Sequence, residues 1–395
     1  MILLIALAES RVIEMHRILA ISADIPQFKA NRILDRQWAM RFPGASWIPL
    51  LNDYLHLKFE VVTADVALSH VLEAFRDPRD ILVIQHGDDP ITRELILRGS
   101  KPLAITCLES PIYAAEFYDH LQEIAKEFAH RILFSEAPSI FSDKDGTHHH
   151  LRFPSYFLDD LNAESVPWNQ RKCMVAVIGN KYVVPHARPP GWQLSELLWW
   201  ARRRASYMRH RPYQSSRLPV QSIQLQDARL ELISFFHQRG ELDLFGQGWT
   251  DLRNLPPRWR QVLTESFSKA PPLPCENKLA TIRGYRFCLC VENARFPGYV
   301  TEKLLDCLVA GVVPLYLGAP DIEKYFPAKC FIDLRKYRSS KSLLEELQSM
   351  SEDAGMSIIE HGRDFLASDA GRAYSYEGFA RFISELVREE VGVKP

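Results

Sequence analysis

The sequence predicts an α/β protein with two domains, each built on a parallel sheet. Three observations support this prediction: the chain has 395 residues of which 47% are hydrophobic, short apolar runs alternate with helical stretches in both halves, and a polar stretch over 159–171 separates the halves. A chain of this length can form two domains with full cores. Alternating strands and helices are typical of parallel sheets covered by helices.

The first half contains apolar runs of strand length that are rich in β-branched residues. The predicted strands are 17–22, 59–63, 81–85 and 103–107. Helical periodicity around 50–57 and 91–99 favours a sheet of the Rossmann type. No Gly-x-Gly-x-x-Gly follows the first strand, so a dinucleotide site in this half is disfavoured.

The rest of the first half is predicted as a helix, a strand and a loop. Apolar spacing over 113–130 indicates an amphipathic helix, and 131–134 indicates a strand. The polar segment 142–150, which includes His148, His149 and His150, is expected to be a solvated loop without an assigned function.

The linker is placed at 159–171, which is polar, contains Pro167 and lacks periodicity. A new strand is predicted over 172–178 and a helix over 226–238. The last predicted helices are 342–347 and 374–387.

The most informative segment is 287–317. Phe287–Val291 has the composition of a buried strand that ends at Glu292 and Asn293. Thr301 is a favourable N-cap residue for a helix that Gly311 would end, and a second apolar strand follows. Right-handed crossovers bring the loop of such a unit to the carboxyl end of the sheet.

This loop places Tyr299, Glu302 and Lys303 at a helix N-terminus. The helix dipole and a lysine together favour a phosphate or pyrophosphate. Glu302 would repel a phosphate and is better suited to sugar hydroxyls, so the two parts together fit a nucleotide-sugar. From spacing alone, ordinary helix capping stays open as the alternative.

Charge and cysteine usage exclude other classes of function. The 48 basic and 49 acidic residues balance to a net charge of −1, so no nucleic-acid partner is expected. The seven cysteines form no Cys-x-x-Cys pair and mostly lie in apolar runs, which predicts reduced core thiols. Cys288 and Cys290 would share one face of a strand, but no His/Cys pair at metal-site spacing accompanies them, so no metal site is predicted.

Two segments bear on membranes. Trp192–Arg217 is rich in tryptophan and arginine, which favours either peripheral contact with an anionic membrane or lipid-linked glycan, or a solvated insertion. Met1–Ala8 is apolar but too short to span a bilayer and has no basic flank. Because Met15 looks like a natural start, we hypothesise that residues 1–14 are dispensable, which activity of a protein beginning at Met15 would support.

A family resemblance is carried by the run from Phe287 to Phe331, which reads FCLCVENARFPGYVTEKLLDCLVAGVVPLYLGAPDIEKYFPAKCF. It resembles the signature of the α-1,3/1,4-fucosyltransferases, glycosyltransferase family ten. The shared features are a strand ending in Glu-Asn, a Tyr-Val-Thr-Glu-Lys turn six residues after Asn293, then Gly-x-Val-Pro and a Gly-Ala-Pro turn.

The resemblance implies the GT-B architecture, two Rossmann-like domains facing across a cleft. The acceptor-binding domain would be 15–165, the donor-binding domain 172–365, and a C-terminal helix would lie in 366–395. The implied reaction moves L-fucose from GDP-β-L-fucose to a hydroxyl of an oligosaccharide or glycolipid, with inversion, for example α-1,3 on an N-acetylglucosamine or glucose-type residue. It needs no metal and no cofactor besides the GDP-fucose co-substrate. Animal members of the family carry a membrane anchor and a Golgi stem. Because no signal or anchor segment is predicted in this sequence, a bacterial-type cytoplasmic enzyme is expected.

The resemblance also implies residue roles. Glu109, at the end of a strand in the first half, carries over as the general base. Arg229, in an Arg-x-x-x-Ile-x-Phe context before Gly-x-Gly-Trp, carries over as a diphosphate contact. The other implied donor-binding residues are Asn293, Tyr299, Glu302 and Lys303. Two alternatives stay open: the same fold using a different GDP-sugar, and a non-catalytic protein that binds sugar nucleotides.

Overall fold

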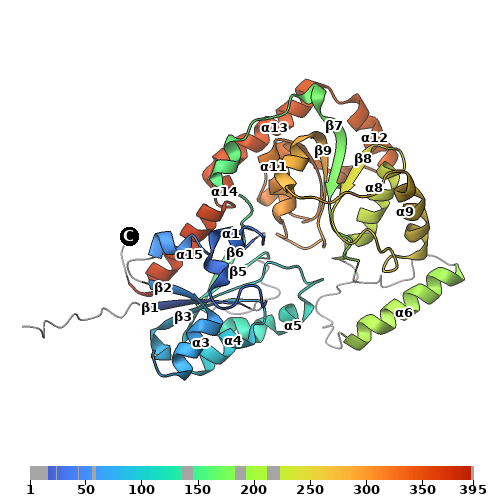
Figure 1. Ribbon diagram of the computed structural model, residues 1–395. Helices are drawn as coiled ribbons and strands as arrows, with labels where there is room; N and C mark the ends of the chain where they lie inside the picture. The colour runs from blue at the N-terminus through green and yellow to red at the C-terminus, as the bar shows by residue number, and fades with distance from the viewer. Residues whose placement is uncertain are drawn as a thin grey trace, which may run out of the picture.

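The computed structural model describes residues 17–23, 25–42, 44–55, 59–135, 146–182, 193–210 and 223–392, with the backbone alone at 203 and 206–210. These residues form two α/β domains, and the chain returns from the second domain to the first near its C-terminus (Figure 1). Parts of three expectations lie outside the described residues: the dispensable segment 1–14, the loop at 142–145, and positions 192 and 211–217 of the basic segment.

The first domain contains a six-stranded sheet with the order β2-β1-β3-β4-β5-β6, in which every neighbouring pair is parallel. Its strands are β1 (Arg17–Ile21), β2 (Phe59–Thr63), β3 (Ile81–His86), β4 (Lys101–Thr106), β5 (His130–Leu133) and β6 (Thr147–His150). The predicted parallel strands are confirmed, with ends shifted by one or two residues. The order reverses between β1 and β3, a topological switch point at which open α/β sheets bind ligands.

Helices cover both faces of this sheet because side chains alternate along its strands. They are α1 (Arg36–Ala39), α2 (Leu51–Leu55), α3 (Ala64–Leu72), α4 (Pro90–Leu97), α5 (Ala115–Ile124) and, from the end of the chain, α15 (Tyr376–Glu390). Ile18 and Ala20 of β1 pack with residues of α3 and α4. Leu19 and Ile21 belong to the larger cluster on the opposite face, with α2, α5 and α15.

Segment 147–150 differs from the sequence prediction. It was expected in a solvated loop, but it forms β6 at the sheet edge and pairs in parallel with β5. The prediction was wrong because an edge strand needs backbone partners rather than an apolar composition. The rings of His149 and His150 pack on Phe382 and Tyr325, so both histidines contact later parts of the chain.

The linker over 159–171 is anchored to the second domain. The 3-10 helix Leu158–Asn162 overlaps the start of the linker, and the 3-10 helix Trp168–Gln170 lies near its end. Arg171 donates from Nη1 to the carbonyl oxygen of Gly311 at 2.6 Å. Trp168 is buried in the core of the second domain.

The second domain contains a five-stranded parallel sheet with the order β11-β10-β9-β7-β8. Its strands are β7 (Lys172–Val177), β8 (Leu242–Phe245), β9 (Tyr285–Val291), β10 (Val313–Leu317) and β11 (Ile332–Asp333). From β7 the chain continues to β8 on one side of the sheet, and from β9 it continues to β10 on the other side. The ends of β7 and β9 therefore form a second switch point.

Helices also cover both faces of the second sheet. They are α6 (Leu194–His210), α8 (Gln226–His237), α9 (Pro257–Lys269), α10 (Lys278–Arg283), α11 (Glu302–Ala310), α12 (Ser340–Ser349), α13 (Glu352–Ala367) and α14 (Asp369–Arg372). On β9, Phe287 and Leu289 pack in the cluster that includes α8, whereas Cys288 and Cys290 pack in the cluster that includes α11. Gly311 ends α11 in the left-handed conformation, as predicted.

The chain crosses back to the first domain through α14 and α15 (Figure 1). Phe379 of α15 contacts Trp47 with ring centroids 4.9 Å apart, inside the core of the first domain. Among the described residues, no helix has the length and apolar content needed to cross a bilayer.

Candidate active site

Glu292, which follows β9, is the centre of a buried polar cluster. Its side chain is fully buried, and both carboxylate oxygens accept hydrogen bonds. Thr301 donates from its backbone N at 2.8 Å and from its hydroxyl at 2.8 and 3.0 Å, and Lys303 Nζ donates at 3.1 Å. Thr301 is the N-cap residue of α11, as predicted, but its side chain makes no capping bond. The anion that the helix N-terminus favours is therefore the carboxylate of Glu292.

Lys303 and Glu302 form the partly open side of this cluster. Lys303 Nζ lies 2.9 Å from Thr301 Oγ1 and 3.5 Å from Glu302 Oε1. Burial alone would lower the pKa of Lys303, but Glu292 and Glu302 raise it above its usual value. Burial alone would raise the pKa of Glu302, but Lys303 and Lys278 hold it below its usual range. Both side chains are therefore charged at neutral pH.

Lys278 of α10 joins the cluster from a different element. Its Nζ lies 2.5 Å from Asp306 Oδ2 and 3.5 Å from Glu302 Oε1. Burial alone would lower the pKa of Lys278, but Asp306 and Glu302 raise it. Burial raises the pKa of Asp306 to about 6. Lys278 is thus placed to orient Glu302, a role that nothing in its sequence context indicated.

Arg229 of α8 holds the end of β9. Its Nη2 donates to the carbonyl oxygen of Val291 at 2.7 Å and to Asn293 Oδ1 at 2.9 Å. Its buried Nε has no hydrogen-bond partner among the described residues. Burial lowers the pKa of Arg229. The charge of Arg229 also lowers the pKa of Lys303, which shows that the two cations lie in one neighbourhood.

Tyr299 and Gly298 pack the loop before α11 against the first domain. The Tyr299 ring is 1% exposed and meets Phe134 edge to face at 4.8 Å, while Asn293 Nδ2 lies 3.5 Å from its hydroxyl. Gly298 has φ +67°, and a Cβ there would overlap the carbonyl oxygen of Phe134. Only glycine fits this contact, so the loop is fixed where the domains meet. Tyr299 forms part of the wall beneath the site.

Glu109 lies on the opposite side, after β4, at the rim of a cavity of about 380 Å³. Ser22 and His86, at the ends of β1 and β3, line the same cavity, which therefore occupies the switch point of the first sheet. Most of its wall is apolar, and the aromatic side chains in it are Phe28, Phe42, Trp47, Phe153 and Phe379. Such a wall suits the apolar face of a sugar ring.

The pKa of Glu109 reflects both domains. The Glu109 side chain is exposed at the surface, but the surrounding protein atoms remove part of its hydration. This desolvation raises the pKa of Glu109. The charges of Lys303 and Lys181 lower that pKa, and those of Glu302 and Glu292 raise it. These interactions across the domain boundary show that Glu109 lies within electrostatic range of the polar cluster at α11.

Tyr113 bridges the two domains near Glu109. Its hydroxyl donates to the carbonyl oxygen of Lys181 at 3.0 Å, and Gln226 Nε2 donates to the Tyr113 hydroxyl at 3.3 Å. Gln226 Nε2 also donates to the Lys181 carbonyl at 2.9 Å. The Tyr118 hydroxyl donates to the backbone oxygen of Glu109 at 3.1 Å and so holds the backbone of the loop that precedes Tyr113.

A second cavity, of about 1010 Å³, lies between the end of β8 and α9. It is lined by residues such as Gln247, Trp249 and Arg260. No predicted site residue lines it, so the candidate site is placed between Glu109 and Glu302.

The basic, aromatic segment is described in part, as α6. Leu194 and Leu198 are exposed, and the Arg204 guanidinium lies over the Trp200 ring at 5.5 Å. Trp199 instead packs on Tyr182, with ring centroids 5.8 Å apart. One side of the helix therefore packs on the second domain, as expected for a solvated insertion. The helix also exposes leucines beside arginines, as expected for a helix that contacts a membrane.

The predicted site residues thus gather in one region. The structure links the donor-side set to Glu292 and places Glu109 within electrostatic range of it; that set is Arg229, Asn293, Tyr299, Glu302 and Lys303. Sequence reasoning missed Glu292, Lys278 and Tyr113. Glu292 had a usable signal, because a carboxylate that directly follows an apolar strand in a parallel sheet lies at the ligand-binding edge.

Comparison with known proteins finds similarity over part of the second domain. The model of the glycosyltransferase family 10 (fucosyltransferase) C-terminal domain matches residues 215–357. The alpha-(1,3)-fucosyltransferase FucT of Helicobacter pylori is 27% identical over 105 residues, which are 27% of this chain and 22% of the relative. The human 4-galactosyl-N-acetylglucosaminide 3-alpha-L-fucosyltransferase is 36% identical over 85 residues, 21% of this chain and 24% of the relative. The matched segments span less than a quarter of these relatives.

Solved structures share the fold. The crystal structure of a glycosyltransferase from Rickettsia africae aligns with a TM-score of 0.55 at 8% identity, over 95% of this chain and 99% of that chain. With the two facing parallel sheets, this confirms the predicted GT-B architecture.

Proposed function

We propose that the chain belongs to glycosyltransferase family 10 and transfers L-fucose from GDP-β-L-fucose to a hydroxyl of a glycan, with inversion. One observation above all supports this function: the carboxylate of Glu109, in the first domain, lies close enough to Lys303 and Glu302 of the second domain for their charges to shift its pKa. A glycosyl transfer needs a proton acceptor on one side of the sugar and a charge-stabilised leaving group on the other.

In the proposed reaction, Glu109 takes the proton of the acceptor hydroxyl as its oxygen attacks the anomeric carbon. Burial raises the pKa of Glu109, which strengthens it as a base while leaving it ionised above that pKa. A base of this kind contributes a factor on the order of 10² to 10⁴. The bond to GDP breaks on the opposite face, so the configuration inverts.

The departing diphosphate gains negative charge, and we assign its stabilisation to Arg229 and Lys303. Each fixed positive group contributes a factor on the order of 10² to 10³. Lys303 already pairs with Glu292, and Arg229 already holds Asn293, so both cations have fixed positions before the donor binds. Tyr299 and Glu302 are assigned to holding the nucleotide ribose or the fucose, and Asn293 to the donor loop.

We propose that transfer requires no divalent metal and no further cofactor, because the two cations Arg229 and Lys303 supply the positive charge. Turnover should therefore be unchanged by EDTA and by added Mg²⁺ or Mn²⁺. A loss of turnover on chelation that Mg²⁺ restores would contradict this assignment.

The acceptor is proposed to be an oligosaccharide or glycolipid that enters the cavity beside Glu109, with the enzyme in the cytoplasm. The exposed leucines and arginines of α6 support a further proposal of peripheral membrane contact. Sedimentation with anionic vesicles tests it: binding that raised salt abolishes supports the contact, and no binding at low salt contradicts it.

Glu109→Gln and Glu302→Gln test the function, with Glu116→Gln on the surface of α5 as the matched control. Glu109→Gln should keep GDP affinity and lose transfer by a factor on the order of 10² to 10⁴. Glu302→Gln should weaken binding of GDP-fucose. Calorimetry measures binding, and product formation on a panel of acceptor glycans measures transfer.

Three outcomes would contradict the proposal. Lost GDP affinity in Glu109→Gln would remove the base role. Faster transfer from another GDP-sugar would change the donor. Tight donor binding without donor hydrolysis or transfer in the unsubstituted protein would favour a non-catalytic binding protein.

A further inference from the structure

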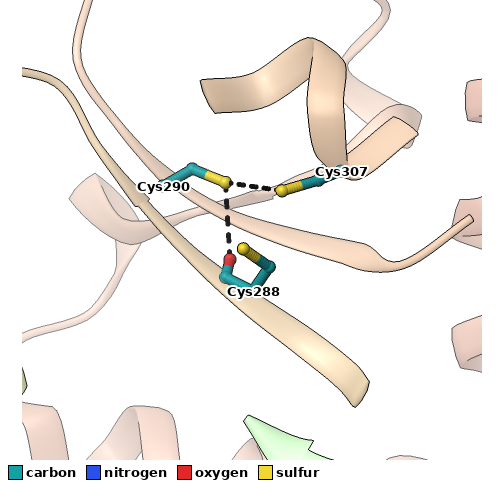
Figure 2. A group of neighbouring side chains, drawn as sticks. All are labelled: Cys288, Cys290 and Cys307. Carbon is teal, nitrogen blue, oxygen red and sulfur yellow. Dashed lines mark hydrogen bonds between the residues drawn. The ribbon is translucent and has the colours of Figure 1, made fainter. Parts of the chain in front are cut away.

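Three buried cysteines meet behind the candidate site. Cys288 and Cys290 lie on β9, and Cys307 lies on α11 (Figure 2). Their three Sγ atoms all lie within 4.8 Å of one another, and the Sγ atoms of Cys290 and Cys307 are 3.1 Å apart. All three residues are at most 3% exposed, and none forms a disulfide.

The fold explains why these sulfurs converge. Residues 288 and 290 are two apart on a strand, so both side chains point to the face covered by α11. Cys307 lies one helical turn after Lys303, and its thiol donates to the Lys303 carbonyl oxygen at 3.1 Å. In Figure 2 the thiols of Cys290 and Cys307 point toward each other, and that of Cys288 lies on the same side of the strand.

No metal site is predicted from the sequence, because no second Cys or His pair lies at metal-site spacing. The third sulfur instead comes as a single residue from the next helix. The cluster is also outside the transfer reaction, since its sulfurs are buried beneath the donor loop and do not line the cavity at Glu109.

The ligand chemistry is that of soft metal ions. Three thiolates without histidine or carboxylate ligands select soft d10 ions such as Cu(I) and Cd(II). Zn(II) suits the site less well, because structural zinc sites take four protein ligands. We propose that Cys288, Cys290 and Cys307 bind one soft d10 metal ion in a three-sulfur site that ties β9 to α11.

The net charge of the occupied site depends on the ion. Each thiol that becomes a ligand releases its proton to solvent, so three thiolates leave a net charge of −1 with Cd(II) and −2 with Cu(I). Hydrogen bonds from Cys290 and Cys307, followed by the charge of Lys278, lower the pKa of Cys288.

The test uses the full chain, reduced with a phosphine and freed of metal by a chelator. Cd(II), Cu(I) and Zn(II) are added separately, and the metal retained after desalting is measured by mass spectrometry. The ultraviolet thiolate-to-cadmium charge-transfer band reports sulfur ligation. The key variant replaces Cys107, Cys173, Cys275 and Cys330 with serine and keeps only the cluster.

We expect this variant to retain one equivalent of Cd(II) or Cu(I), with the charge-transfer band, and to bind Zn(II) more weakly. Cys307→Ser should weaken Cd(II) binding by at least about 10-fold, the loss that even outer-shell changes cause. Cys330→Ser, which changes a buried cysteine outside the cluster, should not. Circular dichroism checks folding, and Cys307→Ala replaces the serine variant if that one unfolds.

Each other result overturns the proposal. No retained Cd(II) or Cu(I) in the cluster-only variant would mean that the three thiols are core packing. Equal binding by Cys307→Ser would place the ion elsewhere. Tighter binding of Zn(II) than of Cd(II) and Cu(I) would contradict the three-sulfur geometry. Because these measurements need no sugar donor, they are independent of whether the chain is a fucosyltransferase.

Discussion

At the scale of single residues, Glu292 shows how one buried carboxylate organises the site. A buried charge is costly unless it is paired and fully hydrogen-bonded. Glu292 meets both conditions through Thr301 and Lys303. Gly318 packs so closely that a Cβ there would contact the Glu292 side chain at 2.6 Å. The glycine that follows β10 therefore makes room for the carboxylate that follows β9.

Lys181 is predicted to set the pH dependence of the reaction. Its positive charge lowers the pKa of Glu109, which burial raises. Lys181→Met removes that charge, so the pKa of Glu109 should rise further. Because Glu109 must be ionised to accept a proton, the acidic limb of kcat/KM should move to higher pH, by a few tenths to about one pH unit.

The measurement is the pH profile of kcat/KM, with Lys101→Met at the start of β4 as control. The control should leave the limb unchanged. A limb that stays in place or moves to lower pH in Lys181→Met would mean that the limb does not report Glu109. The Lys181 backbone oxygen that accepts from Tyr113 is kept in the variant, so the domain contact is not disturbed.

Lys278 is predicted to contribute to stability through its pair with Asp306. Lys278→Met leaves the buried Asp306 without its cation, and removing one partner of a buried pair costs about 3–5 kcal/mol. The Lys278 side chain is 30% exposed, so solvent screening should reduce the loss to about 2–3 kcal/mol. Urea unfolding measures it.

The double variant Lys278→Met, Asp306→Leu should regain most of that stability, because no unpaired charge remains. Lys269→Met, which removes an exposed pair with Glu265, should cost less than about 1 kcal/mol. A double variant that is as unstable as the sum of its single variants would show that the two residues act independently.

At the scale of elements, the sequence predicted those strands and helix ends that a local residue pattern encodes. Apolar runs located strands such as β1 and β9, and Gly311 marked the end of α11. The polar edge strand β6 was missed because its pairing with β5 involves the backbone. Tyr299, Glu302 and Lys303 were found because they are neighbours in sequence.

Partners from distant elements could not be predicted in this way. Lys278 reaches Glu302 from 24 residues away, and Cys307 reaches Cys290 from 17 residues away. Such proximity is set by how α10 and α11 pack on the sheet, which no spacing along the chain expresses.

The loop before α11 yields a prediction about glycine. Gly298→Ala combines a left-handed backbone with an overlap at the Phe134 carbonyl oxygen, whereas Gly240→Ala has φ +71° and no heavy atom within 4 Å of the added Cβ. Gly240→Ala should therefore cost only the conformational term, about 1–2 kcal/mol. Gly298→Ala should cost more and should also weaken GDP binding, because the loop must move away from β5.

Urea unfolding and calorimetric titration with GDP measure the two effects. Equal losses of stability in the two variants would show that the Phe134 contact carries no energy. Unchanged GDP affinity in Gly298→Ala would separate the loop from the donor site.

At the scale of the whole molecule, the two sheets present their switch points to a common cleft. The β1/β3 end carries the cavity beside Glu109, and the β7/β9 end carries Glu292 and its partners. The contacts that hold these ends in register come from loops, such as Gly298 against Phe134, and from α15 packing on the first domain. The distance between the proposed base, Glu109, and the proposed donor site therefore depends on a few domain contacts.

The Tyr113 bridge is a contact between the domains that can be removed without changing a charge. Tyr113→Phe keeps the ring and deletes the hydrogen bonds to Lys181 and Gln226. Each such bond contributes about 0.5–1.5 kcal/mol, so kcat should fall by a factor of about 5 to 100 if the bridge holds the domains in their reactive spacing.

Donor affinity tests whether the effect is one of spacing. GDP contacts are assigned to the second domain alone, so the Kd for GDP should change less than about twofold in Tyr113→Phe, while kcat falls. Tyr54→Phe on α2 is the control of the same kind and should alter neither quantity. A loss of GDP affinity equal to the loss in kcat would place Tyr113 in the donor site, and an unchanged kcat would mean that α15 and the Gly298 contact suffice to hold the cleft.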